Sequence, residues 1–156
     1  MSIISNDLLY ELIGESVRVN RGGRESQKGT VVAVYLDYFI LLSENKMFYY
    51  YQLQHLKSIT KNAKDVAADI GVLPIFAEGE DFQDLLQILK HRWVKINCGG
   101  LEKNEGILQD VSSEYVTLIV KEEIVQIPHF HIKNVTYDIQ ALEDEIYGYQ
   151  DYQSNN

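Results

Sequence analysis

The sequence predicts a mainly β fold with short helices, arranged as two tandem, duplicated small β-barrels of the Sm-like or SH3 type, each with an N-terminal helix. Three observations predict it. The motif Val17–Gly23 returns as Val94–Gly100, roughly 77 residues later, a period too long for most solenoid repeats. Apolar and polar residues alternate in short runs, which is typical of strands. Helical spacing of apolar residues occurs at the start of each copy.

The repeat extends in both directions from this motif. Upstream, Asp7-Leu8-Leu9 matches Asp84-Leu85-Leu86, and downstream, after a slip of one residue, His55–Thr60 matches His131–Thr136. A long period that occurs only twice indicates a duplicated small domain. The predicted organisation is a first Sm-like repeat at 5–62, a linker at 63–80, a second repeat at 81–138, and an acidic, tyrosine-rich tail at 139–156. Each copy is small for an independent core, so we expect the copies to pack together.

Each copy is predicted to begin with a short helix. The apolar stripes are Leu8, Leu9, Leu12 and Ile13 in the first copy and Phe82, Leu85, Leu86 and Leu89 in the second. Ser5 or Asn6 can cap the first helix and Asp81 the second, because their side-chain oxygens accept from free N–H groups. Gly14 can end the first helix.

Five short strands are predicted to follow each helix. The first begins at Val17 or Val94, and the others are 30–36, 39–43, 47–51 and 57–60, matched by 107–111, 115–120, 124–127 and 133–137. The glycine pairs at 22–23 and 99–100 predict turns. Closing such a sheet into a barrel removes exposed edges. The expected core residues are Val17, Val19, Leu41, Ile59, Val94, Ile96, Leu118 and Val135.

The composition of the chain disfavours several classes of partner. The chain has 156 residues and a formal net charge of −9, which disfavours phosphate backbones, so no nucleic-acid partner is expected. It has no long apolar run and no basic leader before an apolar segment, so we expect neither a membrane partner nor a secretion signal. Its single cysteine, Cys98, excludes an internal disulfide framework.

The charge is unevenly distributed. Residues 5–62 carry seven Lys/Arg against six Asp/Glu, whereas residues 81–138 carry six against nine. The densest positive patch is Arg18, Arg21, Arg24 and Lys28. Opposite charge at opposite ends favours head-to-tail contact between molecules. Tyr49, Tyr50 and Tyr51 are the candidate surface that supplies the affinity of this contact. The alternatives are that the charges only keep a monomer soluble, and that the tyrosines reflect β-propensity.

Other candidate sites have weaker support. His129 and His131 could bind a metal, but no third ligand has a suitable spacing. Cys98 has no nearby base to make it a nucleophile, although a lone cysteine can form a disulfide between chains. The glycine pairs lack the Gly-Lys-Ser/Thr of a phosphate loop. We therefore expect no enzyme, no catalytic, cofactor-binding or metal residues, no cofactor, and no small-molecule substrate.

Four segments carry a family resemblance. Asn20–Gly29, Tyr50–Thr60, Trp93–Gly100 and Phe130–Val135 resemble the spore coat protein B family of Bacillus-type endospore formers. The resemblance implies a non-enzymatic structural component of the spore coat, made in the mother-cell cytoplasm. Its implied partners are other spore coat proteins and further copies of itself. Arg24 and Leu101 depart from a frequent family proline and Cys98 from an arginine. The Ser/Lys/Arg-rich tail of longer members is absent from this sequence.

An Sm-like RNA-binding protein is the alternative. That class has the same strand order but needs a positive, aromatic-lined rim and an Arg-Gly or Lys-Gly turn before the last strand. Here the corresponding turns contain Gln54-His55 and Phe130-His131, and the chain is acidic. The coat assignment is therefore the preferred prediction.

Overall fold

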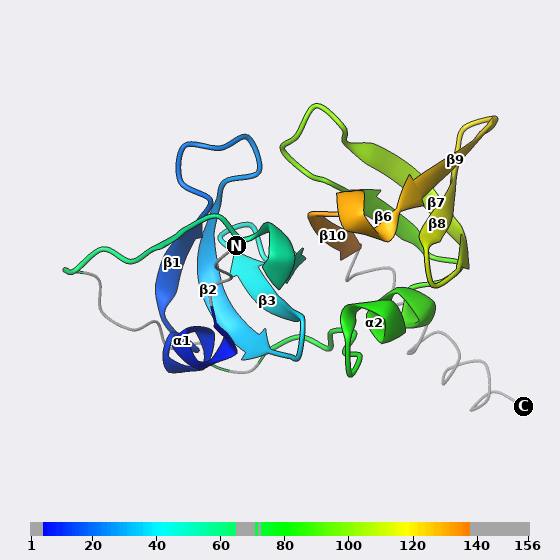
Figure 1. Ribbon diagram of the computed structural model, residues 1–156. Helices are drawn as coiled ribbons and strands as arrows, with labels where there is room; N and C mark the ends of the chain where they lie inside the picture. Colours follow the sequence, from blue (N-terminus) through cyan, green and yellow to red (C-terminus); the bar gives the residue numbers. More distant parts are fainter. Residues whose placement is uncertain (1–4, 65–70, 72, 138–156) are drawn as a thin grey trace, which may run out of the picture.

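The computed structural model describes residues 5–64, 71 and 73–137, and within them the fold is mainly β. Figure 1 shows the short helices and the antiparallel strands. The first half contains α1 (Asn6–Glu11), β1 (Ser16–Val19), β2 (Gln27–Val34), β3 (Tyr38–Ser43), β4 (Phe48–Gln52), the 3-10 turn η1 (Leu53–His55) and β5 (Ile59–Thr60). The second contains α2 (Phe82–Ile88), β6 (Trp93–Ile96), β7 (Asn104–Val111), β8 (Tyr115–Val120), β9 (Glu123–Pro128), η2 (His129–His131) and β10 (Asn134–Tyr137).

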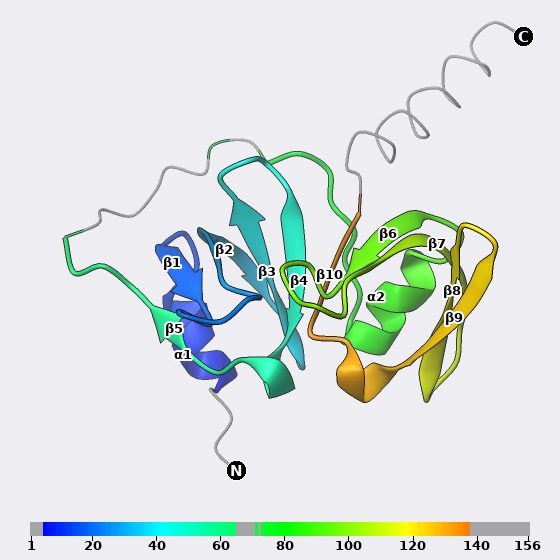
Figure 2. The same cartoon turned by 90° about the horizontal axis from the view of Figure 1, so that it is seen from above.

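The described strands form one ten-stranded sheet that is not closed, in the order β5-β1-β2-β3-β4-β10-β6-β7-β8-β9. The sequence predicts two separately closed barrels, and this closure is wrong. The described sheet stays open because β10 pairs antiparallel with β4, with Val135 opposite Tyr50. The free edge of β4 is thereby used by the second half, and β5 pairs only with β1. Figure 2 shows the two halves side by side, with β4 and β10 between them.

The predicted helix caps are confirmed. The Ser5 hydroxyl accepts a hydrogen bond from the Leu8 N–H at 3.4 Å, and the Asp81 carboxylate accepts from the Asp84 N–H at 2.7 Å. The first helix ends at Glu11 with Leu12 as its C-cap, and Gly14, two residues further on, adopts a φ of 87°. At the matching place in the second half, His91 adopts a φ of 73°. The same backbone conformation is therefore used in both halves, once without glycine.

The loops after β1 and β6 fold alike. Asn20 and Asn97 have φ values of 53° and 59°, a left-handed conformation that asparagine tolerates better than most residues. The Asn20 side-chain oxygen accepts from the Lys57 N–H at 2.8 Å, and that of Asn97 accepts from the Lys133 N–H at 2.7 Å. Each asparagine thereby ties the loop to the segment before the last strand of its half. The glycine pairs are recognisable as turns in the sequence, whereas this role of asparagine is not.

The one-residue slip in the repeat lies in the hairpin before β4 and β9. Phe39 faces Tyr51, whereas Val116, which is the counterpart of Phe39, faces Ile127. The counterpart of Tyr51 is therefore Ile127, one residue nearer than the spacing of the earlier strands. From this hairpin onward, each position in the first half matches the position 76 residues later, as Ile59 and Val135 do through their pairings.

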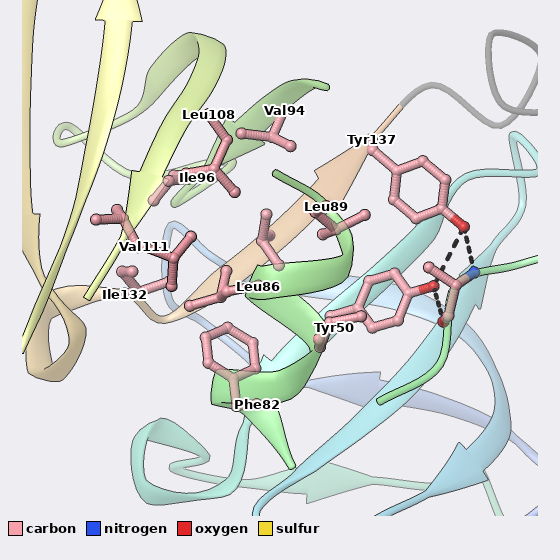
Figure 3. Packing of buried hydrophobic residues seen from close by; sticks show 14 of the residues in the cluster. Tyr50, Phe82, Leu86, Leu89, Val94, Ile96, Leu108, Val111, Ile132 and Tyr137 are labelled. Carbon is pink, nitrogen blue, oxygen red and sulfur yellow. Dashed lines mark hydrogen bonds between the residues drawn. The ribbon is translucent and has the colours of Figure 1, made fainter. Parts of the chain in front are cut away.

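Two hydrophobic clusters hold the fold. One lies in the first half and includes Leu9, Val31 and Phe39. The other surrounds α2 and includes residues of β3 and β4 as well as most strands of the second half. Figure 3 shows Phe82 and Leu86 of α2, and Leu89 at its C-cap, in this second cluster. The second half therefore completes its core with residues from the first.

Most of the predicted core is confirmed. Val17, Val19, Leu41, Val94, Ile96, Leu118 and Val135 are buried, whereas Ile59 is only half-buried. Phe76 of the predicted linker packs on the fold, with its ring 4.9 Å from that of Phe48. The remaining linker residues 65–70 and 72 and the predicted tail at 139–156 lie outside the described residues.

Candidate assembly interface

The pairing of β4 with β10 is the main contact between the two halves, and we call it the junction. The Gln52 N–H donates to the Lys133 carbonyl at 3.1 Å. The Gln52 side-chain amide donates to the carbonyls of His129 and Ile132 at 2.9 and 2.6 Å. The Thr136 hydroxyl donates to the Phe48 carbonyl at 2.6 Å. Main-chain and side-chain bonds thus fix both the register and the orientation of the two strands.

The loops at 20–26 and 97–103 continue the junction. Figure 1 shows them leaning towards each other at the top of the view. The Lys133 ammonium donates to the Glu25 carboxylate at 2.9 Å, and this contact holds the pKa of Glu25 below its usual value. A Cβ added to Gly99 would collide with the Arg24 carbonyl oxygen. The glycine therefore allows the two backbones to approach closely.

Tyr49, Tyr50 and Tyr51, which the sequence suggested as a contact surface, are buried within the chain. The reason is that both faces of β4 are covered. Tyr49 and Tyr51 pack in the first cluster, and Tyr50 packs in the second, beside Tyr137. These tyrosines stabilise the junction within the chain, and none offers a surface to another molecule.

The buried hydroxyl of Tyr50 has a hydrogen-bond partner. It donates to the Ala77 carbonyl at 2.6 Å, as Figure 3 shows, and burial raises the pKa of Tyr50 far above its usual value. The Tyr38 hydroxyl similarly donates to the Gly79 carbonyl at 2.5 Å, and burial raises the pKa of Tyr38 to about 12. These two hydrogen bonds hold linker residues Ala77 and Gly79 against β3 and β4.

Three of the four predicted basic residues gather on one face. Arg18, Arg21 and Lys28 line an open groove of about 310 Å³, which also includes Thr60 of β5. Arg18 donates to the Ser26 hydroxyl at 3.2 Å. Arg24 does not line this groove, because its backbone packs against Gly99 in the junction. The basic groove therefore lies beside the edge strand β5, and its role in interaction stays a prediction.

Cys98 is buried in the first cluster, although it belongs to the second half. Its N–H donates to the Asn134 side-chain oxygen at 3.0 Å. Burial raises the pKa of the thiol, so the reactive thiolate is disfavoured. An interchain disulfide at Cys98 would require this part of the junction to open.

We expect Cys98 to react slowly with a thiol-specific reagent in the folded protein and completely after denaturation. The physical reason is the combination of burial and a disfavoured thiolate. The measurement is the rate of colour release with an aromatic disulfide reagent, with and without denaturant. A native rate equal to the denatured rate would show that the thiol is accessible and contradict its place in the junction.

Three histidines, His55, His129 and His131, lie near the junction. His55 of η1 bonds the Phe130 carbonyl of η2 and packs edge-on against the Phe130 ring at 5.4 Å. Burial lowers the pKa of His55 and of His129 below the ordinary value of 6.5. His131 is exposed and contacts the Phe130 ring. Among the described residues, no three His, Cys, Asp or Glu side chains gather to hold a metal ion.

These shifts predict loss of stability in mild acid. Because both pKa values are lower in the folded chain, the unfolded chain binds more protons as the pH falls below 6.5. The melting temperature should therefore fall as the pH goes from neutral towards 5, above the range where carboxylates titrate. Thermal unfolding across this range measures it. The His55→Asn/His129→Asn variant should show a flatter dependence, and an unchanged slope would contradict the assignment.

Two strand edges remain unpaired at the ends of the described sheet, β5 beside the basic groove and β9 at the other end. Glu123, the first residue of β9, and Glu122 just before it are exposed. Edges of this kind are templates for pairing with another chain unless they are protected. The arrangement can therefore support assembly through its edges. Neither described helix has the length and apolar character needed to cross a lipid bilayer.

The comparisons with known proteins agree with the resemblance in the sequence. No protein-family model matches the chain. The chain is 36% identical over 135 residues to Spore coat protein B of Bacillus subtilis (strain 168). The match covers 84% of this chain and 34% of that protein, so the chain spans about a third of the length of its relative. Over this matched region, the chain belongs to the spore coat protein B family.

Proposed function

We propose that the chain is a non-enzymatic structural component of the bacterial spore coat and acts through protein–protein assembly. The observation that carries the proposal is its 36% identity to a protein named Spore coat protein B. The match covers 34% of that relative, so the role of the whole relative is transferred here only as a proposal. The structural observation in its favour is a sheet with unpaired edges at both ends, beside groups of opposite charge.

We further infer that residues 5–62 and 81–138 are two duplicated Sm-like units joined by a linker at 63–80. The support is the shared order of one helix, four strands, a 3-10 turn and a last strand. Asn20 and Asn97 also make equivalent hydrogen bonds to Lys57 and Lys133. Local geometry that recurs at matched sequence positions favours duplication over coincidence.

The expected partners are other spore coat proteins and further copies of this chain. The expected location is the spore coat, after synthesis in the mother-cell cytoplasm. Nucleic acid, membranes and small-molecule substrates are not expected partners. The basic groove lined by Arg18, Arg21 and Lys28 is small, and the chain carries a net charge of −9, which opposes a phosphate backbone.

Imaging of a fluorescent fusion during sporulation tests the proposal. The fusion is expected to accumulate as a shell around the developing spore. A uniform mother-cell signal that persists to spore release would contradict it. A gel-shift titration with single-stranded RNA tests the competing class, for which a tight complex at physiological salt would be required.

A further inference from the structure

The two unpaired edges of the sheet are the counterparts of the two strands that meet at the junction. β9 pairs with β8 as β4 pairs with β3. β5 pairs with β1 as β10 pairs with β6. Inside the chain, β4 is bonded to β10. At the ends of the described sheet, the equivalent strands β9 and β5 have no such neighbour.

Apolar residues that the junction buries are exposed at the β9 end. Tyr38 and Phe48 are both 0% exposed, because α2 and the linker cover the outer face of β3 and β4. Their counterparts on β8 and β9 are Tyr115, 39% exposed, and Ile124, 72% exposed. Among the described residues, no comparable layer covers these apolar side chains on the outer face of β8 and β9.

The β5 end shows the complementary difference. Leu85 of α2 and Val135 of β10 are both 0% exposed in the second cluster. Their counterparts in the first half are Leu8, 42% exposed, and Ile59, which is only half-buried. Each end of the molecule therefore exposes the residues whose counterparts are in contact at the junction.

The charged pair of the junction has sequence counterparts, one in each half of the chain. Lys133 bonds Glu25 across the junction at 2.9 Å. The counterparts are Lys57 beside β5 and Glu102 in the loop after β6, and both are exposed. Within the described part of the chain, neither of these two side chains has an ion-pair partner within 4 Å, although the charge of Lys57 helps to lower the pKa of Glu25. Asn20 and Asn97 accept hydrogen bonds from the backbone N–H groups of Lys57 and Lys133 in the same way. The two lysines therefore occupy equivalent positions in the two halves.

The loop contact has an open counterpart as well. Gly99 is packed against the Arg24 carbonyl. Gly22 occupies the same place in the first half with a similar φ of 83°, and a Cβ added there would meet nothing within 4 Å. Leu101, the counterpart of Arg24, is 83% exposed. The space beside Gly22 is therefore free to accept a loop such as the one that contains Leu101.

We propose that β9 of one molecule pairs antiparallel with β5 of a second copy, repeating the junction between molecules. This inference deepens the proposed assembly role and rests on it. The register of the junction places Gln126 opposite Ile59 of the neighbour and Glu102 beside its Lys57. Glu122 and Glu123 then lie towards Lys61 and Lys64 of the neighbour. The contact is heterologous, so it builds rings or filaments.

This contact is weaker than the junction itself. Pro128 replaces Gln52 and has no N–H, so the main-chain bond to the lysine carbonyl and both side-chain amide bonds are lost. Gln126 replaces the buried Tyr50, which removes apolar area. Association is therefore reversible and depends on concentration, while the matching contact within one chain persists.

Zero-length carbodiimide cross-linking tests the contact directly. Equal amounts of light and isotope-labelled protein are mixed, treated and digested, and cross-linked peptides are identified by mass. The Lys133–Glu25 link should appear only as pairs of the same label, because it is within one chain. The Lys57–Glu102 link should appear with mixed labels. A sample that gives the first link and not the second, at concentrations where the protein self-associates, overturns the proposal.

Charge reversal supplies the second test, read out by sedimentation of the full chain. Lys57→Glu and Glu102→Lys should each weaken association about tenfold, and the double variant should recover it. Lys46→Glu, with the same charge change at an exposed turn, is the matched control and should leave association unchanged. A wild-type protein that stays monomeric at every concentration also overturns the proposal. Coat localisation with unaltered oligomers in these variants would reject this contact and leave the proposed function standing.

Discussion

Val94→Asp is expected to unfold the protein or to lower its free energy of unfolding by about 4 kcal/mol or more. Val94 is 0% exposed in the cluster around α2, and it lies in β6 between Tyr137 of β10 and Gly106 of β7. The buried neighbours of Val94 in that cluster are hydrophobic and aromatic side chains. A carboxylate placed there would lose its hydration without gaining a partner, which is the mechanism behind the largest destabilisations. Chemical denaturation followed by circular dichroism measures the loss.

The control is Gln109→Asp on the neighbouring strand β7. Gln109 is exposed and lies at the irregularity between Leu108 and Asp110, outside the paired register. The same carboxylate at this place should change stability by only about 0.5 kcal/mol. Equal denaturation curves for Val94→Asp and the wild type would show that β6 does not pack as described.

Gly99→Ala is expected to lower the free energy of unfolding by about 3 kcal/mol. Part of the loss comes from the φ of 89°, which costs about 1 kcal/mol for a residue with a Cβ. The larger part comes from the collision of that Cβ with the Arg24 carbonyl, which forces the two loops apart. Denaturant unfolding measures the total.

Gly22→Ala separates the two contributions. Gly22 has nearly the same φ, but an added Cβ there meets nothing within 4 Å. We therefore expect it to cost only the conformational part, about 1 kcal/mol. A loss as large for Gly22→Ala as for Gly99→Ala would mean that the junction contributes nothing at this position.

The local features of the fold could be predicted from the sequence because they depend on neighbouring residues. Ser5 and Asp81 cap their helices through side chains three residues from the bonded N–H. Val17 and Val94 lie in strands whose alternation is visible over a few residues. The family relationship was also readable, because the motif around Asn20 recurs around Asn97 in the same order.

The junction could not be predicted, because it joins residues that are distant in the sequence. Alternation along Tyr49, Tyr50 and Tyr51 predicts one buried and one exposed face, but it carries no information about a second layer that covers the outer face. Here α2 and the linker provide that layer. Ile59 shows the opposite error, since the sequence predicts a core residue and the missing neighbour strand leaves it half-buried.

The residues of the candidate interface could be predicted from the sequence only in part, for the same reason. Arg18 and Lys28 are opposite each other in the β1–β2 pairing, and the clustering of basic residues in the sequence anticipated their proximity. Arg24 is close to them in sequence, yet its backbone is held against the second half. Lys57 and Glu102 gave no signal of their own, because each is a single exposed charge. Their equivalence to Lys133 and Glu25 becomes apparent only through the geometry of the junction.

Fractionation of purified spores tests the central claim most directly. The coat is removed from washed spores by denaturing extraction, and the protein is quantified in the coat extract and in the remaining core. A structural coat component is expected almost entirely in the coat extract and resistant to washing without denaturant. Recovery mainly in the core, or complete release by a simple salt wash, would contradict the assignment of this chain as an assembled part of the spore coat.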